Sequence, residues 1–484
     1  MAISSATPID AAPRKQTLSS NYVDFTSSAT EGWAQQYLPD LMEKEAEIYG
    51  KRTIAGFLAQ VGAEEASAAD RVIWSEQGRL HLAYKATIAG SPAGDVSDNI
   101  FTITKDIDGN TIASGGHGIR KGDIVLISQA TATIRGYVDN TDATTITVHP
   151  YSHADCGAAG LSDDSTADAV RILVVGSEFA KGTDARDAAN SPKFKSHMNK
   201  HIILKDYYEV SGSDASAIGW VEVSGEEGQN GYLWYLKAEG DTRARFADYL
   251  EMAMLEGELT LDASVVDLQT GNDTGADGSG TEGLFKAITN RGHQTTGVTG
   301  VNAATDLAEF DAILAVFDQN GAIEENMMFV DRSTSLAMDD MLASMNSYGA
   351  GGTSYGVFDN SEDMALNLGF SGFRRGSYDF YKSDFKYLND KGTRGALNDT
   401  VNAIRGVVVP AGVSSVYDEM LGKNMKRPFL HVRYRASETE SRKMKTWVTG
   451  SVGAMTSGKD VMEVHYLSER CLVTQGANNF MLMN

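Results

Sequence analysis

The chain has 484 residues, of which 42% are hydrophobic, 8% aromatic and 22% charged, a composition that excludes the disordered and collagen-like classes. A chain of this length predicts about two to four domains of roughly 100 to 200 residues each. The formal net charge is -23 and no long basic run is present, so sequence-specific recognition of nucleic acid is disfavoured.

The two cysteines, Cys156 and Cys471, lie far apart in the sequence, which excludes a disulfide framework and a Cys-x-x-Cys metal site. This usage fits a reducing cytosol. No run of about 18 apolar residues occurs, and the first residues contain no apolar segment of signal-peptide length. We therefore expect a soluble protein that makes no contact with a membrane and is not secreted by a recognisable signal.

The N-terminal segment, up to about residue 30, is rich in Ser, Thr and Ala with almost no apolar periodicity, a composition that predicts disorder in an isolated monomer. About 25 extended residues reach roughly 80 Å, so as an ordered arm the segment is expected to lie along other subunits. The pattern of residues 31–50 predicts an amphipathic helix with a kink at Pro39. Residues 54–61 and the stretch GAEEASAAD after them predict a further helical turn or two.

Short β-branched runs separated by turn residues fill residues 101–175, among them FTIT, DIVLIS, TTITV and VRILVV. This pattern predicts a small barrel or sandwich. A polar, irregular segment follows to about residue 200, and HIILKDYYEV is then one more strand. We expect a long protruding loop that carries an inserted β domain at about residues 95–178.

Residues 231–258 predict the longest helix of the chain, because Leu233, Phe246 and Leu250 recur at helical spacing. A break is expected near Gly240, since glycine weakens a helix interior. A loop rich in Gly and Asp follows this helix.

A well-specified helix is predicted for residues 305–320, with Asp306 and Glu309 spaced as a capping pair and Gly321 as its end. A buried strand at residues 327–330 and a second helix at residues 333–345 come next. The strand and this helix carry a stripe of methionine residues. The simplest interpretation of the stripe is core packing, and the alternative is an adaptable contact between subunits. The stripe comprises Met327, Met328, Met338, Met341 and Met345.

The order of these parts resembles the major capsid proteins of tailed phages, which have the Hong Kong 97 fold. The stretch ENMMFVDRSTSLAMDDMLASM is similar to the strand-then-helix step in the axial domain of such proteins. The resemblance implies an α+β fold. It implies an N-terminal arm with an amphipathic helix (1–57), an extended loop with an inserted β domain (58–230), a spine helix and peripheral domain (231–300), an axial domain (301–410) and return strands that complete both domains (411–484).

The resemblance also implies a function: self-assembly through hexamers and pentamers into an icosahedral shell that encloses double-stranded DNA, with no enzymatic activity. The implied partners are portal, scaffolding and decoration proteins, and packaged DNA contacted without sequence preference. The implied location is the virion, and the host cytoplasm during assembly. An encapsulin-type cargo compartment, which shares the fold, is the alternative; the long inserted loop and the chain length count against it.

A third hypothesis is a serine hydrolase. Gly352 to Gly356 match the G-x-S-x-G pattern around Ser354, with His431 and His465 downstream as candidate bases. A nucleophile elbow needs a strand before the serine and a helix after it, whereas this match lies in a glycine-rich loop. The loop interpretation is therefore preferred.

Two glycine motifs are also incomplete. Gly278, Gly280 and Gly283 match G-x-G-x-x-G without the preceding strand that a dinucleotide site requires, and Asp273 and Asp277 in the same loop have no EF-hand spacing. The segment GAMTSGK fails as a P-loop, because Asp460 stands where Ser or Thr must bind magnesium.

Histidines with metal-ligand spacing form two groups, His149 and His153 with Cys156, and His197 with His201 on one expected helical turn. Neither group has further ligands nearby in the sequence, so solvated loop histidines are the preferred interpretation. The sequence assigns no catalytic, cofactor-binding or metal-binding residue and implies no cofactor.

Overall fold

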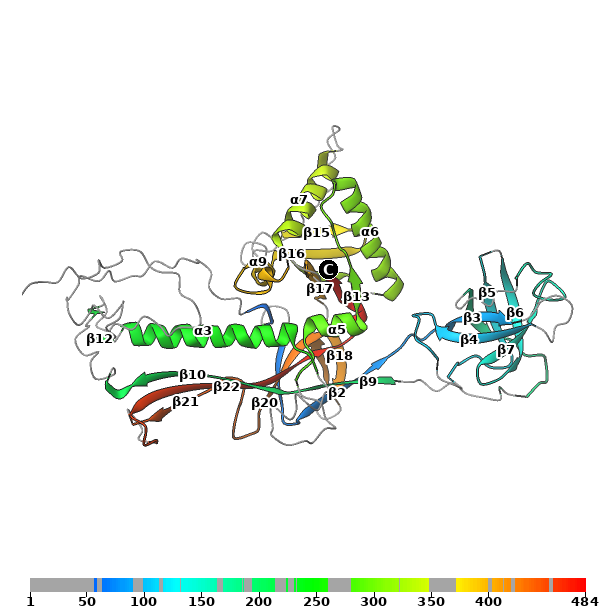
Figure 1. Ribbon diagram of the computed structural model, residues 1–484. Coiled ribbons are helices and arrows are strands. Elements are labelled where there is room, and N and C mark those ends of the chain that lie inside the picture. The colour runs from blue at the N-terminus through cyan, green and yellow to red at the C-terminus, as the bar shows by residue number, and fades with distance from the viewer. Residues whose placement is uncertain are drawn as a thin grey trace, which may run out of the picture. The chain divides into compact units, whose positions relative to one another are not determined.

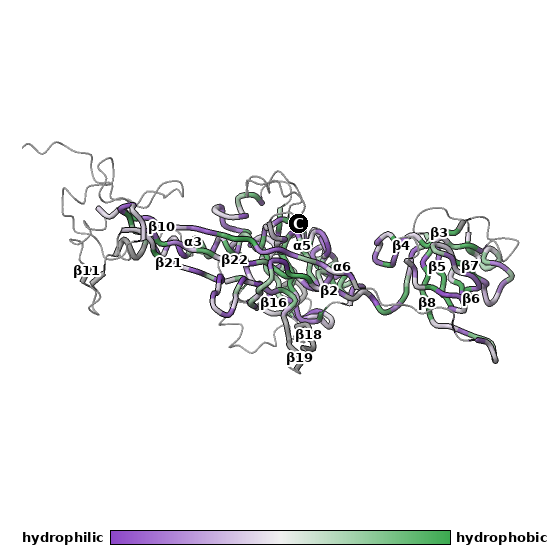
Figure 2. Tube along the Cα trace, turned by 90° about the horizontal axis from the view of Figure 1, so that it is seen from below, coloured by the Kyte–Doolittle hydropathy of each residue, from purple (hydrophilic) through white to green (hydrophobic). Residues whose placement is uncertain are grey.

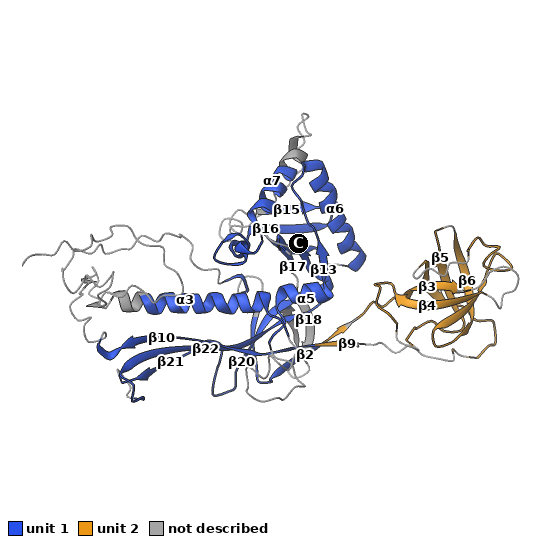
Figure 3. Ribbon diagram, in the orientation of Figure 1, with its two compact units in different colours: residues 1–74, 198–484 blue, residues 75–197 orange. Residues whose placement is uncertain are grey.

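The computed structural model has a mixed α and β architecture, and the chain divides into two compact units (Figure 3). Unit 1 comprises Met1–Trp74 and Met198–Asn484, and unit 2 comprises Ser75–His197. The structure describes residues 56–58, 63–89, 99–112, 116–130, 132–162, 169–184, 186, 194–213, 223–224, 230–231, 233–259, 280–321, 323–347, 371–398, 403–411, 413–418, 423–451 and 456–484. The predicted arm and the helix at residues 31–50 lie outside these residues.

Unit 1 contains two main sheets. The first has the strand order β1-β20-β22-β10, with β21 also paired to β22, and the second has the order β13-β23-β17-β14-β16-β15. The strands of the first sheet are β1 (Ala63–Ser67), β10 (Ile202–Ser211), β20 (Leu430–Arg435), β21 (Lys445–Gly450) and β22 (Val461–Thr474). Those of the second are β13 (His293–Thr295), β14 (Glu325–Val330), β15 (Ser371–Arg375), β16 (Tyr378–Asp384), β17 (Gly406–Pro410) and β23 (Met481–Met483).

Helices and short strand pairs complete this unit. The helices are α3 (Leu233–Glu256), α5 (Leu284–Arg291), α6 (Ala303–Asn320), α7 (Arg332–Ser347) and α9 (Lys386–Asn389), with 3-10 turns η3 (Arg394–Ala396) and η4 (Ala477–Asn479). The paired short strands are β11 (Val223–Ser224) with β12 (Asn230–Gly231), and β18 (Val413–Asp418) with β19 (Lys423–Pro428). The chain passes between the two units at β2 (Arg71–Gln77) and at β9 (Phe194–Lys200). These two strands pair with each other.

The long helix α3 lies along the ribbon that β10 and β22 form (Figure 1). Phe246 and Leu250 on the helix pack against Val464 and Tyr466 on β22 in a small core cluster. The helix runs through Gly240 without interruption, so the predicted break there is wrong. Packing of the helix against the ribbon outweighs the cost of about 1 kcal/mol for one interior glycine.

Helix α6 confirms the predicted helix at residues 305–320 but not its predicted cap. Asn302 is the N-cap, and its side-chain oxygen accepts a hydrogen bond from the backbone nitrogen of Thr305 at 3.0 Å. Asp306 instead accepts from the backbone nitrogen of Gly300 at 2.8 Å, which ties the preceding loop to the helix. Gly321 ends the helix at φ 62°, the left-handed conformation that glycine adopts without strain.

The second sheet and the helices α6 and α7 enclose a core rich in methionine and phenylalanine. Met328, Met338 and Met341 are fully buried there, as the packing interpretation of the methionine stripe requires. The side chain of Met345 lies outside the described residues.

Strand pairing corrects two predictions. Ala63–Ser67 is a strand that pairs in parallel with β20, so the helical turn expected there is wrong. Phe194–Lys200 is likewise a strand, in a segment expected to be irregular. Neither run has strong β-branched character, and pairing with distant strands decides its conformation.

Unit 2 is built around a closed antiparallel barrel with the strand order β3-β4-β7-β6-β5-β8. Its strands are β3 (Ala83–Ala89), β4 (Ile100–Asp106), β5 (Asp123–Ser128), β6 (Thr133–Thr141), β7 (Thr145–Pro150) and β8 (Val170–Ser177). Hydrophobic and hydrophilic residues alternate along these strands (Figure 2). The alternation fills the interior with side chains such as Ile88, Phe101 and Ile127, which are fully buried.

The barrel begins at Ala83, before the predicted start near residue 95. Strand β3 closes the barrel because it pairs with both β4 and β8. Its sequence, AYKATIA, has few β-branched residues, which is why its pattern is weak. Gly136 on β6 has a packing role, since a Cβ at this position would lie 2.2 Å from Val148 Cγ1 on the neighbouring strand.

Candidate assembly surfaces

The residues of the hydrolase hypothesis are not brought together within the described part of the chain. Ser354 and its loop lie outside that part. His431 on β20 is buried, and its Nδ1 lies 3.2 Å from the carbonyl oxygen of Pro428. His465 on β22 instead contacts the hydroxyl of Thr449 at 2.8 Å.

The glycine motifs have local structural roles where the structure describes them. Gly283 donates its backbone N–H to the carbonyl of Gly257 at 2.8 Å, directly before α5 begins. A Cβ at Gly283 would lie 2.5 Å from the nitrogen of Gly257, so glycine permits this close backbone approach. Gly278, Asp273 and Asp277 lie outside the described residues.

Lys459, the lysine of the incomplete P-loop motif, forms ion pairs with carboxylates. Lys459 Nζ contacts Glu209 at 2.8 Å and Glu463 at 3.1 Å. The neighbouring Asp460 accepts a hydrogen bond from the hydroxyl of Ser451 at 2.8 Å. This arrangement links β10 to the start of β22 and places two carboxylates around the ammonium group of Lys459.

The histidines with metal-ligand spacing are dispersed. His149 pairs with Asp139 at 3.5 Å, whereas Cys156 is fully buried, and burial raises the pKa of its thiol to about 12. His197 and His201 lie on or beside a strand, so the expected helical turn is wrong. Among the residues that the structure describes, no group of three potential metal ligands occurs.

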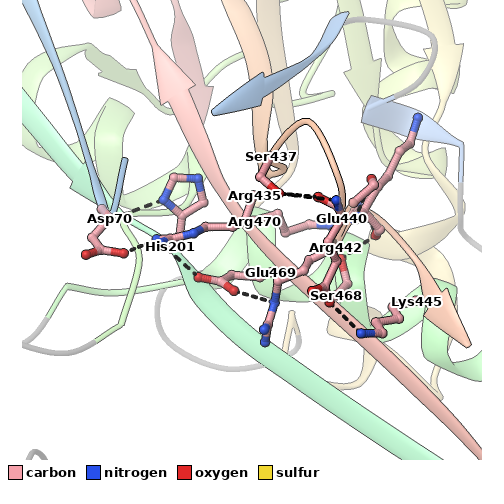
Figure 4. Close-up of polar contacts among 12 residues, drawn as sticks. Asp70, His201, Arg435, Ser437, Glu440, Arg442, Lys445, Ser468, Glu469 and Arg470 are labelled. Atoms are coloured by element: carbon pink, nitrogen blue, oxygen red, sulfur yellow. Dashed lines mark hydrogen bonds and ion pairs between the residues drawn. The ribbon is translucent and has the colours of Figure 1, made fainter. Parts of the chain in front are cut away.

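A cluster of charged side chains occupies the first sheet of unit 1 (Figure 4). Glu469 on β22 is its centre, with Arg442 Nε at 2.6 Å and Arg435 Nη1 at 3.8 Å. Arg435 also pairs with Asp70, whose backbone oxygen lies 3.3 Å from Nδ1 of His201. Burial lowers the pKa of the His201 imidazole, which favours the neutral ring at this position.

A second group of charged side chains surrounds Arg470, which follows Glu469 on β22 and so points to the opposite face of the sheet. This guanidinium approaches Glu64 on β1 at 3.8 Å, and burial lowers its pKa while the carboxylates of Glu64 and Glu251 oppose the shift. Glu251 on α3 accepts hydrogen bonds from the backbone nitrogens of Gly56 at 3.2 Å and Leu58 at 3.3 Å. Burial is the largest cause that raises the pKa of Glu251.

Phe57 adds an apolar anchor at the same junction. Its ring is buried and contacts the rings of Phe329 at 4.6 Å and Phe385 at 4.8 Å. Together with Glu251, it fixes residues 56–58 to α3 and to the core of unit 1. This junction is therefore a structural connection between residues 56–58, α3 and the core of unit 1.

An aromatic row on the ribbon was not found from the sequence. Tyr207, His465 and Trp447 lie opposite one another on β10, β22 and β21. The ring of His465 stacks on Tyr207 at 5.9 Å and on Trp447 at 5.2 Å, and Tyr207 is 55% exposed. The signal in the sequence is the alternation in HIILKDYYEV, but the partners lie far away along the chain.

The barrel also has an apolar outer patch. Leu126 on β5 lies opposite Leu173 on β8, and both side chains are exposed together with Val175. Beside it, the guanidinium of Arg135 lies over the ring of Tyr151 at 5.4 Å. Exposed apolar groups of this kind are typical of contact surfaces between proteins.

Comparison with known proteins found no matching protein-family model and no matching curated protein. The chain is similar in structure to a chain of Mycobacterium phage Ogopogo, at 12% identity and a TM-score of 0.39, over 91% of this chain and 96% of that one. It is similar to a chain of the capsid of cyanophage P-SCSP1u at 9% identity and a TM-score of 0.39, over 95% of each chain. It also matches the capsid of an empty GTA particle at 10% identity and a TM-score of 0.34, over 93% of this chain and 96% of that one.

None of the helices within the described residues combines the length and the apolar composition needed to cross a membrane.

Proposed function

We propose that this chain is the major capsid protein of a tailed phage, with a Hong Kong 97-type fold, and that it assembles into an icosahedral shell around double-stranded DNA. The arrangement of unit 1 carries the proposal. The 24-residue helix α3 lies along the ribbon of β10 and β22, and a separate sheet is covered by α6 and α7. In this assignment α3 is the spine helix, its sheet is the peripheral domain, and the second sheet with α6 and α7 is the axial domain.

The physical reason lies in the apolar side chains that α3 and the ribbon leave exposed. Among the described residues of these elements, Ile203, Tyr207, Tyr249 and Val448 are exposed. A closed shell needs large contacts between identical subunits, and exposed apolar side chains can supply them. A structural role in a shell therefore fits these elements better than a role in catalysis.

The barrel of unit 2 is assigned as a domain inserted into the extended loop, because the chain enters it through β2 and leaves it through β9. Its apolar patch around Leu126 and Leu173 is a candidate contact with other subunits or with a decoration protein. The N-terminal arm is assigned to contacts with neighbouring subunits.

The charge balance fits a container. A net charge of -23 opposes adhesion to packaged DNA, so contacts with DNA are expected to be few and without sequence preference. Hexamers and pentamers of this chain, a portal protein and a scaffolding protein complete the proposed assembly, which forms in the host cytoplasm and ends in the virion.

Electron microscopy of the full chain, expressed alone and with a scaffolding protein encoded beside it, tests the proposal. The expected result is closed shells of uniform size. Discrete monomers under every condition contradict it. Shells that enclose a partner protein instead of DNA in the native host indicate a cargo compartment, and esterase activity abolished by Ser354→Ala indicates a hydrolase.

A further inference from the structure

The face of the ribbon turned away from α3 is exposed along β10 and partly exposed along β21 and β22, where Leu467 is buried. Arg245 on α3 pairs with Asp206 on β10 at 3.2 Å, so Asp206 marks the face that the helix covers. Because successive residues of a strand point to opposite faces, Lys205, Tyr207 and Glu209 lie on the other face, and all three are exposed. We call this surface of β10, β22 and β21 the open face.

Strand register arranges the open face in three rows, one acidic, one aromatic and one basic. Neighbouring rows are about 7 Å apart, since they are two residues apart along a strand. The rows are Glu209, Glu463 and Thr449; Tyr207, His465 and Trp447; and Lys205, Leu467 and Lys445.

The outer rows differ in the sign of their charge. In the acidic row, Lys459 bridges Glu209 and Glu463, which leaves one carboxylate in excess. In the basic row, Lys445 pairs with Glu440, which leaves the ammonium group of Lys205 in excess. The charge therefore changes sign across the aromatic row.

The central row has the properties of an interface centre. Its rings are stacked on one another, with interplanar angles of 26° and 19°. Tyrosine and tryptophan dominate the binding energy of protein interfaces, and rings already held in place lose little conformational entropy on binding.

We propose that the open face binds the open face of a second copy of this chain about a two-fold axis that runs along the aromatic row. Rotation about this axis reverses the strand direction, so the acidic row of one copy faces the basic row of the other, and each aromatic residue faces its own counterpart. A two-fold axis parallel to the strands would instead place acidic row on acidic row. The charge pattern therefore selects the first axis.

The contact is small by itself. Three strands about 4.8 Å apart and three rows about 7 Å apart cover a few hundred Å², below the roughly 800 Å² per partner of a standard interface. Isolated copies should thus associate weakly, and the contact becomes effective when it is repeated in an assembly. The inference deepens the proposed function, since it identifies one surface through which copies would meet.

Cysteine crosslinking with a short bis-maleimide tests the axis in the full chain. Both native cysteines are buried, so background reaction is low. Tyr207→Cys should give a crosslinked dimer, because the two copies of this position face each other. Val448→Cys is the matched control, since it is 45% exposed but lies on the α3 side of the same ribbon, opposite Val464. Equal crosslinking of both variants overturns the inference.

Charge exchange tests the pairing of the rows. Lys205→Glu or Glu209→Lys should each weaken self-association at least about fivefold, because the symmetric contact occurs twice. The double variant should recover the original affinity, measured by sedimentation equilibrium, because the two rows exchange signs. Failure of the double variant to recover contradicts the proposed axis.

The two proposals fail in different ways. If the Tyr207→Cys variant forms shells but gives no crosslinked dimer, the proposed function is supported and the two-fold contact is contradicted. Crosslinked dimers from a chain that never forms shells support the contact and count against the capsid.

Discussion

Replacement of Asn199 should damage the packing of unit 1 without removing apolar volume. Its side chain is 1% exposed, and its Nδ2 donates to the carbonyls of Glu282 at 2.9 Å and Leu472 at 2.6 Å. Its Oδ1 accepts from the backbone nitrogen of Glu282 at 2.8 Å and from the hydroxyl of Thr281 at 3.1 Å. One amide thus joins β9, β22 and the segment before α5.

Asn199→Ala should lower the free energy of unfolding of unit 1 by about 3 to 5 kcal/mol, since each buried group left without a partner costs about 1 to 3 kcal/mol. Asn199→Asp should lower the free energy of unfolding further at neutral pH, because a carboxylate would face the two carbonyl oxygens. The pKa of that buried carboxyl would lie above its value in the unfolded chain. The native state would then bind a proton first, and stability would rise as the pH falls through the folded pKa.

Urea unfolding of the full chain, with hydrogen exchange of β22 as the local probe, measures both effects. Asn290→Ala is the matched control, since Asn290 is exposed and its Nδ2 contacts Glu282 Oε1 at 3.2 Å. It should change stability by less than about 1 kcal/mol. If Asn199→Ala is as stable as the control, the amide does not hold these elements together and the reasoning is wrong.

Three further predictions concern other parts of the chain. Phe57→Ala should destabilise unit 1 by about 3 to 5 kcal/mol, read as a lower melting temperature, whereas Phe57→Leu should retain most of the packing. Ile127→Ala should lower the unfolding free energy of the barrel by about 2 to 5 kcal/mol and leave hydrogen exchange in unit 1 unchanged; a loss of protection in both units would show that they do not fold separately. Glu251→Gln should remove a pH dependence of the unfolding free energy. Burial raises the pKa of Glu251, so as the pH falls the native state takes up a proton before the unfolded chain does. The stability of the wild type should therefore rise as the pH falls through the folded pKa. Equal slopes of unfolding free energy against pH for Glu251→Gln and wild type would contradict this assignment.

Local patterns in the sequence were sufficient for helices α3, α6 and α7 and for part of the strands. The β-branched runs between residues 101 and 175 predicted the barrel strands other than β3, because alternation along a strand is a property of neighbouring residues. The helix before Gly321 was predicted with its correct end, since the left-handed conformation there requires no partner. The N-terminal cap of this helix was not predicted correctly, because Asp306 accepts a hydrogen bond from the backbone of Gly300 in the preceding loop.

The sequence by itself determined the mixed α and β class and the strand-rich character of residues 101–175. Tertiary structure alone decided that Ala63–Ser67 is a strand, that α3 continues through Gly240, and that one amide at Asn199 joins three elements. It also decided the rows of the open face, because β10, β22 and β21 come from distant parts of the chain and only their register aligns Tyr207 with its stacked partners. Periodicity shows which side of a strand is buried, whereas the choice of its neighbour depends on packing across the whole unit.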